Sequence, residues 1–152
     1  VQSANYNSRS QIVISGEKKA VEEASLKLVE AGARKVIPLS VSGAFHSPLM
    51  SSAEKGLQEA VNAVLIRSTE SAVYSNVTAY IVKGENEIRS AIVSQLTSPV
   101  KWYQTIEALV ELGYTEYVEI GPGKVLAGLL KRINKDVNVV NINSVSDIEK
   151  LN

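Results

Sequence analysis

Short runs of β-branched residues alternate with amphipathic segments of helical length along most of this chain. Gln11–Ser15 has the sequence QIVIS and is followed by a glycine, as a buried strand often is. Residues 17–32 then carry apolar side chains at helical spacing, and Gly32 is a typical helix stop. Residues 34–39 form another strand-like run. A strand, a helix and a strand in direct succession predict a compact α/β unit.

The same alternation continues toward the C-terminal end of the chain. Further helices are predicted at residues 48–65, 85–96, 102–112 and 125–133. Further strands are predicted at residues 72–82, with a break at Ser75 and Asn76, and at residues 114–120 and 136–142. Residues 143–152 are expected to form an exposed tail. This pattern is typical of a mostly parallel sheet covered by helices.

Composition and charge argue against several classes of protein. The 152 residues suffice for one domain with a real core, or for part of a larger one. The 16 basic residues balance the 16 acidic ones, which argues against a nucleic-acid surface and an anionic-membrane surface. No apolar run approaches the roughly 20 residues that span a bilayer, and residues 1–10 lack a signal-peptide core, so we expect a soluble cytoplasmic protein. With no cysteine and one histidine, we expect no metal site.

Four stretches carry residue types that could perform chemistry: ANYNS, GAFHSPLM, QLTSPVKW and EIGPGKVLAGLLKRI. Each has a structural interpretation when taken alone. Asn5 and Asn7 suit a turn between strands. The GPGK sequence suits a turn between a strand and a helix, because it lacks the spacing of a phosphate-binding loop. Gln95 suits a helix end, and a single histidine such as His46 is usually packed or solvated, although imidazole titrates near neutral pH.

In their order and spacing, the four stretches resemble one family, the malonyl-CoA:acyl carrier protein transacylases, kin to the acyltransferase domains of polyketide synthases. The resemblance extends over essentially the whole chain. It implies an α/β fold made of the C-terminal part of a hydrolase-like α/β subdomain and the remainder of a small ferredoxin-like subdomain. Residues 1–39 would belong to the small subdomain, and residues 40–152 to the large one.

The resemblance also implies a ping-pong acyl transfer in fatty acid synthesis, carried out by a serine and a histidine. His46 matches the family's catalytic histidine, a general base that takes the serine proton and later activates the phosphopantetheine thiol of the carrier protein. The backbone carbonyl of Gln95 would accept the proton of the other imidazole nitrogen, in place of the carboxylate of a Ser-His-Asp triad. The side chain of Gln95 is therefore expected to matter little.

The expected substrate and partner follow from the same resemblance. Asn5 and Asn7 match positions near the acyl-CoA cleft, and Phe45 matches a bulky ring that leaves little room for a branched acyl group. Malonyl-CoA is the expected substrate and acyl carrier protein the expected partner, with no cofactor, no metal, and no nucleic acid or membrane partner. Three cations could meet the acidic carrier protein, although a solvated helix face explains them more simply: Lys124, Lys131 and Arg132.

The nucleophile of this mechanism is absent, because no GxSxG motif occurs in the 152 residues. In the family, the oxyanion-hole glutamine loop and the malonyl-binding arginine also lie upstream of ANYNS. We therefore expect the C-terminal part of a longer enzyme, inactive alone, whose partner is the missing N-terminal part. Two alternatives remain open: a non-catalytic fragment that binds acyl-CoA or carrier protein, and a hydrolase that uses a local serine such as Ser42 or Ser47.

Overall fold

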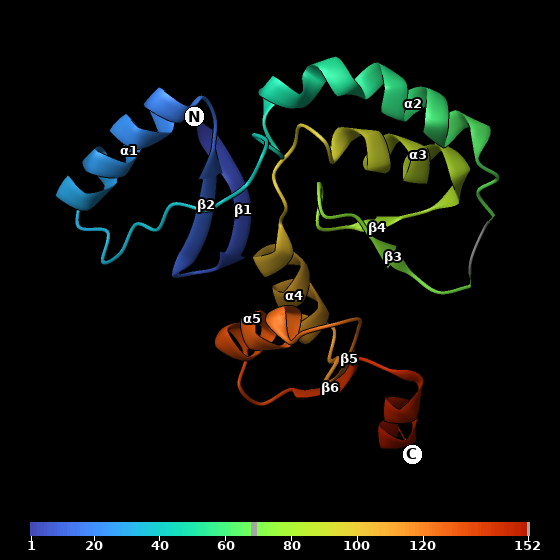
Figure 1. Ribbon diagram of the computed structural model, residues 1–152. Coiled ribbons are helices and arrows are strands. Elements are labelled where there is room, and N and C mark those ends of the chain that lie inside the picture. Colours follow the sequence, from blue (N-terminus) through green and yellow to red (C-terminus); the bar gives the residue numbers. More distant parts are fainter. Residues whose placement is uncertain (68–69, 152) are drawn as a thin grey trace.

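The computed structural model describes residues 1–67 and 70–151 as a mixed α/β chain (Figure 1). Within the described residues the strands form two-stranded sheets. The pairs are β1 (Gln2–Ser8) with β2 (Gln11–Ser15), β3 (Val73–Tyr74) with β4 (Ile81–Val82), and β5 (Glu116–Ile120) with β6 (Asn138–Ile142). The first two pairs are antiparallel and the third is parallel.

The prediction of a mostly parallel sheet is therefore wrong for the described residues. β1 and β2 are antiparallel because Arg9 and Ser10 alone join them, and so short a link allows no crossover. β5 and β6 run parallel because α5 (Val125–Ile133) connects them as a crossover helix. The break predicted at Ser75 and Asn76 is confirmed, since it separates β3 from β4.

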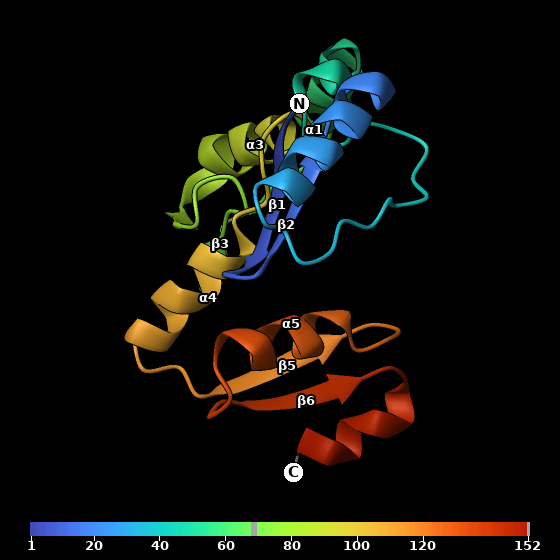
Figure 2. The same cartoon turned by 90° about the vertical axis from the view of Figure 1, so that its left-hand side faces the viewer.

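Residues 34–39, predicted as a strand, form no regular secondary structure. They belong to a loop that runs away from the β1–β2 ribbon after α1 (Lys18–Glu30), as Figure 2 shows. β2 pairs instead with β1, a segment for which the sequence favoured a turn. Pro38 has no amide hydrogen to give to a sheet. No strand of the described residues pairs with this segment, so its backbone groups remain outside any ladder.

The predicted helices are present, α5 with the predicted ends and the other four with shifted ends. They are α1, α2 (Glu54–Ala63), α3 (Gly84–Ser94), α4 (Trp102–Glu111) and α5. The helix predicted at residues 48–65 begins as a separate 3₁₀ helix, Pro48–Ala53, with its proline in the first turn. The expected C-terminal tail contains a 3₁₀ helix, Val145–Leu151, and its last residue, Asn152, lies outside the described residues.

The tightest core lies where α4 and α5 pack against β5 and β6. Ile106, Leu130 and Val137 come from α4, α5 and the residue before β6, and each is at most 3% exposed. Partly buried side chains surround these three: Trp102, Leu109, Val110, Tyr117, Ile133 and Val139. α4 also packs against β1, so one helix joins the N-terminal hairpin to the C-terminal β–α–β unit.

β1 is tied by its backbone to the segment between α3 and α4. The amide of Tyr6 donates to the carbonyl of Val100, and the amide of Val100 donates to the carbonyl of Ala4, both at 2.8 Å. This pair of bonds forms a short parallel bridge at Asn5. The amide of Lys101 donates to the carbonyl of Asn76. The hairpin, the β3–β4 region and the start of α4 therefore meet at residues 100–101.

The GPGK sequence, residues 121–124, forms the turn between β5 and α5. Gly121 and Gly123 have φ of 133° and 95°, which side chains other than glycine rarely tolerate. The carboxylate of Glu119 accepts the amides of Leu126 and Ala127, at 3.0 and 2.9 Å. A carboxylate of the chain itself thus occupies the N-terminus of α5, the end of a helix where an anion would bind. This arrangement favours the structural turn over a phosphate site.

Truncating the core leucine of α5 tests how much this packing stabilises the chain. We expect Leu130→Ala to lower the free energy of unfolding by about 2–5 kcal/mol, because lost transfer energy and a residual cavity add. The matched control is Leu26→Ala in α1, where the side chain is 68% exposed; its loss should stay below about 1 kcal/mol. Urea unfolding followed by circular dichroism measures both, and equal losses would contradict the assigned core.

Removing the carboxylate at the start of α5 tests the cap. Glu119→Ala should lower the free energy of unfolding by about 1 kcal/mol, because two helix amides lose their acceptor. Glu116→Ala is the control, since this residue lies on the same strand with an exposed side chain and one surface hydrogen bond to Asn138. Its loss should be about half as large or less. A Glu119→Ala variant as stable as the parent chain would refute the cap.

Candidate functional site

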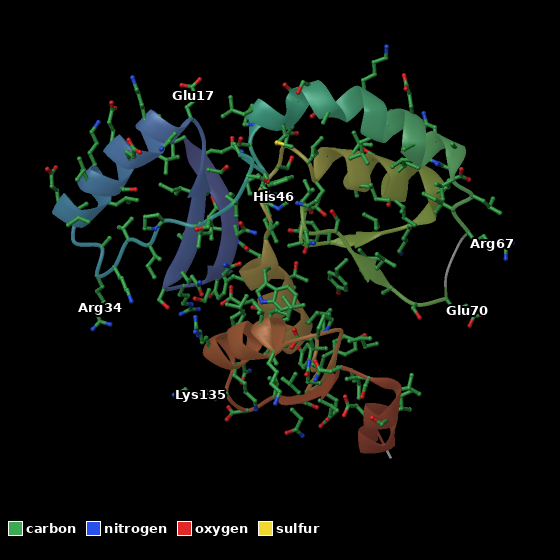
Figure 3. The ribbon with its side chains drawn as sticks, viewed as in Figure 1. Glu17, Arg34, His46, Arg67, Glu70 and Lys135 are labelled. Atoms are coloured by element: carbon green, nitrogen blue, oxygen red, sulfur yellow. The ribbon has the colours of Figure 1, made fainter. Side chains whose placement is uncertain are left out.

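His46 lies in the loop before the 3₁₀ helix and has an unusual backbone conformation. Its φ is 60°, and Ala79 is the other non-glycine residue with positive φ in the described part of the chain. A left-handed conformation costs a side-chain-bearing residue roughly 1–2 kcal/mol. Such strain persists where the surrounding contacts impose it, and it concentrates at functional sites. In Figure 3, His46 sits between the β1–β2 ribbon and the α2–α3 pair.

Three hydrogen bonds hold the His46 loop in this conformation. The amide of His46 donates to the carbonyl of Leu96 at 3.1 Å. The carbonyl of His46 accepts Nε2 of Gln2 at 2.6 Å. The hydroxyl of Ser47, which is 1% exposed, donates to the carbonyl of Ala44 at 2.6 Å and closes the turn. Gln2 was not among the predicted site residues, because nothing in the local pattern marks a glutamine 44 residues from the histidine.

The imidazole of His46 meets the C-terminal turn of α3. Its Nδ1 lies 2.9 Å from the backbone carbonyl oxygen of Gln95, the residue that caps α3. A carbonyl oxygen only accepts, so Nδ1 must carry the proton in this contact. The side-chain Nε2 of Gln95 is 3.3 Å from the same Nδ1 and 3.3 Å from the carbonyl of Ser98. Because Nδ1 is already a donor, the amide of Gln95 donates to Ser98.

This tautomer leaves the other imidazole nitrogen, Nε2, with a lone pair. Among the described residues, no group of the chain forms a hydrogen bond with that nitrogen. A neutral imidazole held in this way can accept a proton at Nε2 while the Gln95 carbonyl keeps the ring in place. The structure therefore brings His46 and Gln95 together, through the main chain of Gln95.

Asn5 and Asn7 lie within β1, so the turn interpretation of these residues is wrong. Asn5 pairs with Val13 of β2 and bridges to Val100 on its other side. Both asparagines are partly buried, and within the described residues neither side-chain amide has a hydrogen-bond partner. Asn5 and Asn7 lie on the same strand as Gln2, whose side chain binds His46. Within the described residues, no hydrogen bond joins either asparagine to His46 itself.

Phe45 precedes the histidine and is 47% exposed. Its ring lies against Gly43, where an added Cβ would come within 3.2 Å of the ring. A side chain at position 43 would therefore push the ring away by a few tenths of an ångström.

A cleft of about 400 Å³ lies elsewhere, at the tip of the β1–β2 hairpin. Arg9 donates to the Tyr103 hydroxyl and to Glu107, the latter at 3.0 Å, and its guanidinium lies 5.8 Å from the Tyr103 ring centre. The hydrogen bond from Tyr103, with a smaller contribution from Arg9, lowers the pKa of Glu107 below its usual value. None of the five predicted site residues lines this cleft. No local pattern in the sequence marks this cleft, because Arg9 is more than 90 residues from both Tyr103 and Glu107.

Two of the three cations suggested for a partner surface, Lys131 and Arg132, form hydrogen bonds within the chain. Lys131 donates to the carbonyls of Lys135 and Val137, and Arg132 donates to the Gln11 side chain at 2.9 Å. These bonds give both residues a structural use within the chain. Over residues 1–67 and 70–151, no three potential metal ligands cluster, and no helix has both the length and the apolar character to cross a membrane.

Comparison with known proteins places this geometry in a family. The acyl transferase domain family matches residues 1–150. A malonyl CoA-acyl carrier protein transacylase of Bacillus subtilis is 43% identical over 149 residues, which cover 98% of this chain and 47% of the relative. The Staphylococcus aureus (strain COL) protein of the same name is 40% identical over the whole chain and 49% of its own length. The chain thus spans about half the length of these relatives.

Solved structures agree with the sequence matches. The crystal structure of malonyl-CoA:acyl carrier protein transacylase from Xanthomonas oryzae superimposes with a TM-score of 0.91 at 40% identity, covering 98% of this chain and 48% of that one. A malonyl-transacylase in complex with its type II PKS acyl-carrier protein has a TM-score of 0.92 at 37% identity, with the same coverage. The family match over nearly the whole chain and these superpositions lead to one conclusion: the chain belongs to the acyl transferase family.

Proposed function

We propose that this chain supplies the general base of an enzyme that transfers a malonyl group from CoA to the phosphopantetheine thiol of acyl carrier protein. The observation that carries the proposal is the 2.9 Å contact between His46 Nδ1 and the Gln95 carbonyl, which leaves Nε2 as an acceptor. The names of the relatives supply the reaction, since they are malonyl CoA-acyl carrier protein transacylases.

In the first half-reaction, Nε2 of His46 takes the proton of a serine hydroxyl as its oxygen attacks the malonyl thioester. The C–S bond breaks, the CoA sulfur takes the proton from the imidazolium, and the malonyl group remains as a serine ester. In the second half-reaction, Nε2 takes the proton of the carrier thiol, whose sulfur attacks the ester. The serine oxygen leaves and is reprotonated, which restores the starting state. No cofactor is required, because malonyl-CoA is itself the substrate.

We propose that the serine of this scheme comes from a segment outside this sequence, since no GxSxG motif occurs within it. Uncovered apolar side chains support a missing partner segment. On α1 and the loop after it, five such side chains are more than half exposed: Leu26, Val29, Ile37, Leu39 and Val41. Large contiguous apolar patches on a protein surface mark interaction sites. We propose that these five side chains form such a patch and that the rest of a longer enzyme covers it.

Asn5, Asn7 and Phe45 are the proposed substrate contacts. The side-chain amides of the two asparagines, which have no hydrogen-bond partner within the described residues, would donate to the malonyl group or to pantetheine, and the Phe45 ring would restrict the width of the acyl group. Acyl carrier protein is the proposed partner, and the related complex with a carrier protein supports it.

The absence of a GxSxG serine favours a second candidate for the chain on its own, a non-catalytic fragment that binds acyl-CoA or carrier protein. The deciding experiment joins this chain to the part of the Bacillus subtilis relative that it does not match. The intact mass of acyl carrier protein is then measured after incubation with malonyl-CoA. A malonyl-sized increase with the joined protein, but not with the chain alone, supports the enzyme. If the joined protein folds but produces no mass increase, the non-catalytic binding fragment is the supported function. If the chain alone produces the increase, one of its own serines is the nucleophile.

Replacing the base should abolish most transfer in the joined protein. We expect His46→Ala to reduce the transfer rate by about 10²- to 10⁴-fold, the range for loss of a general base. Single-turnover transfer to acyl carrier protein is the measurement, with circular dichroism to confirm folding. A rate within threefold of the parent would remove His46 from the mechanism.

Replacing the neighbouring glutamine should have little effect. Gln95→Ala keeps the backbone carbonyl that accepts the His46 proton, so we expect transfer to remain within about fivefold of the parent rate. The variant also loses the side-chain hydrogen bond from Gln95 to the Ser98 carbonyl, which affects stability. The rates are therefore compared only if the thermal unfolding midpoint of the variant equals that of the parent. A loss as large as that of His46→Ala would show that the side chain of Gln95, and not its main chain, serves the histidine.

A further inference from the structure

We propose that Gln2 is a positioning residue that holds the His46 loop against the C-terminal turn of α3 and so sets the imidazole for proton transfer. This inference rests on the function proposed above. It concerns a residue outside the set derived from the sequence. Among the hydrogen bonds of the described residues, the His46 loop and the turn after α3 meet through the His46 amide, the imidazole and the side-chain amide of Gln2.

The Gln2 amide contacts two backbone carbonyls. Its Nε2 lies 2.6 Å from the carbonyl oxygen of His46 and 3.3 Å from that of Thr97. Both partners are acceptors only, so the nitrogen of the amide must face them, and its two hydrogens match the two carbonyls. Because the site is partly buried, an unmatched carbonyl there would not be fully compensated by water.

The two carbonyls belong to the two sides of the proposed catalytic contact. His46 carries the imidazole, and Thr97 lies two residues after Gln95, whose carbonyl accepts the Nδ1 proton. One amide therefore spans both the base and the turn that orients it. With the amide of His46 bound to Leu96 and its carbonyl bound to Gln2, both backbone polar groups of the strained residue are held.

Gln2 can act as a fixed anchor because its own strand is held independently. It pairs with Ser15 at the end of the β1–β2 ladder, and β1 is bound to Val100 through Ala4 and Tyr6. The turn is held from its other side, since the Thr97 hydroxyl donates to Glu54 at 2.8 Å. Without the Gln2 donors, the positive φ of His46 has less support, and the loop can relax away from the Gln95 carbonyl.

The single histidine of the chain allows a direct test by ¹⁵N NMR, because one imidazole gives one set of ring signals. At a pH of about 9, above the ordinary titration range of imidazole, the parent chain should show the proton on Nδ1. Gln2→Met keeps the length of the side chain and removes both donors, and Gln2→Glu keeps its shape and offers acceptors alone. In both variants we expect the ring signals to move toward the Nε2–H tautomer.

The matched control is Gln58→Met in α2. The Gln58 amide bonds to Asn62 on an exposed helix surface, away from the histidine contacts. This variant should leave the ring signals unchanged. Unchanged ring signals in folded Gln2→Met and Gln2→Glu would overturn the proposal, because the imidazole would then be positioned without Gln2.

A measurement on the unaltered chain keeps the test valid if the variants do not fold. The side-chain amide protons of Gln2 should exchange with solvent at least about tenfold more slowly than those of Gln58, because two carbonyls accept them in a partly buried site. Equal exchange rates would show that the clamp is not formed and would overturn the proposal.

Activity of the joined protein separates this inference from the proposed function. Gln2→Met should lower kcat about tenfold with KM within twofold, because a misplaced base slows the chemistry and leaves binding intact. If the joined parent protein transfers malonyl and Gln2→Met transfers it equally fast, the positioning role fails while the proposed function stands. If the joined parent is inactive, the proposed function fails, and the ring signals still decide whether Gln2 holds the histidine.

Discussion

The pair of backbone hydrogen bonds between β1 and Val100 is the connection on which the site depends. Val100 lies two residues before α4 and follows the turn that ends α3. The next residue, Lys101, donates its amide to the carbonyl of Asn76. This connection places Gln2 of the N-terminal hairpin beside the carbonyls of His46 and Thr97. A β1 strand bound elsewhere would take the Gln2 amide away from the carbonyl of His46.

The orientation of the proposed base by a carbonyl has a physical consequence. A carboxylate partner brings a full negative charge, which stabilises the imidazolium as it forms. The Gln95 carbonyl brings a dipole, and it lies at the C-terminal end of α3, where the helix carries partial negative charge. The proposed base thus receives orientation mainly from the hydrogen bond and a weaker electrostatic contribution from the helix end. With a carbonyl in place of a carboxylate, the proposed base depends more on accurate placement of its loop. The hydrogen bonds that hold the strained His46 backbone are therefore important for the proposed function.

Local patterns predicted the helices well because helix formation depends on side chains three and four positions apart, as in α3 and α5. Strand pairing was predicted poorly. A β-branched run such as residues 34–39 reports that a segment suits a sheet, but it does not report whether a partner strand is adjacent. In the described residues β2 found its partner in β1, whose asparagines suggested a turn. The cluster of Arg9, Tyr103 and Glu107 was missed for the same reason, since its members meet only through the fold.

The sequence by itself determined which residues can do chemistry: one imidazole, no thiol, and four stretches whose order resembles a transacylase. It also determined the positions of the helices, because their periodicity is local. The resemblance implied that the Gln95 carbonyl orients the imidazole, but tertiary structure alone decided that Gln2, 44 residues away in the sequence, binds the strained His46 loop. These contacts use backbone carbonyls, which every residue possesses, so no side-chain pattern can announce them.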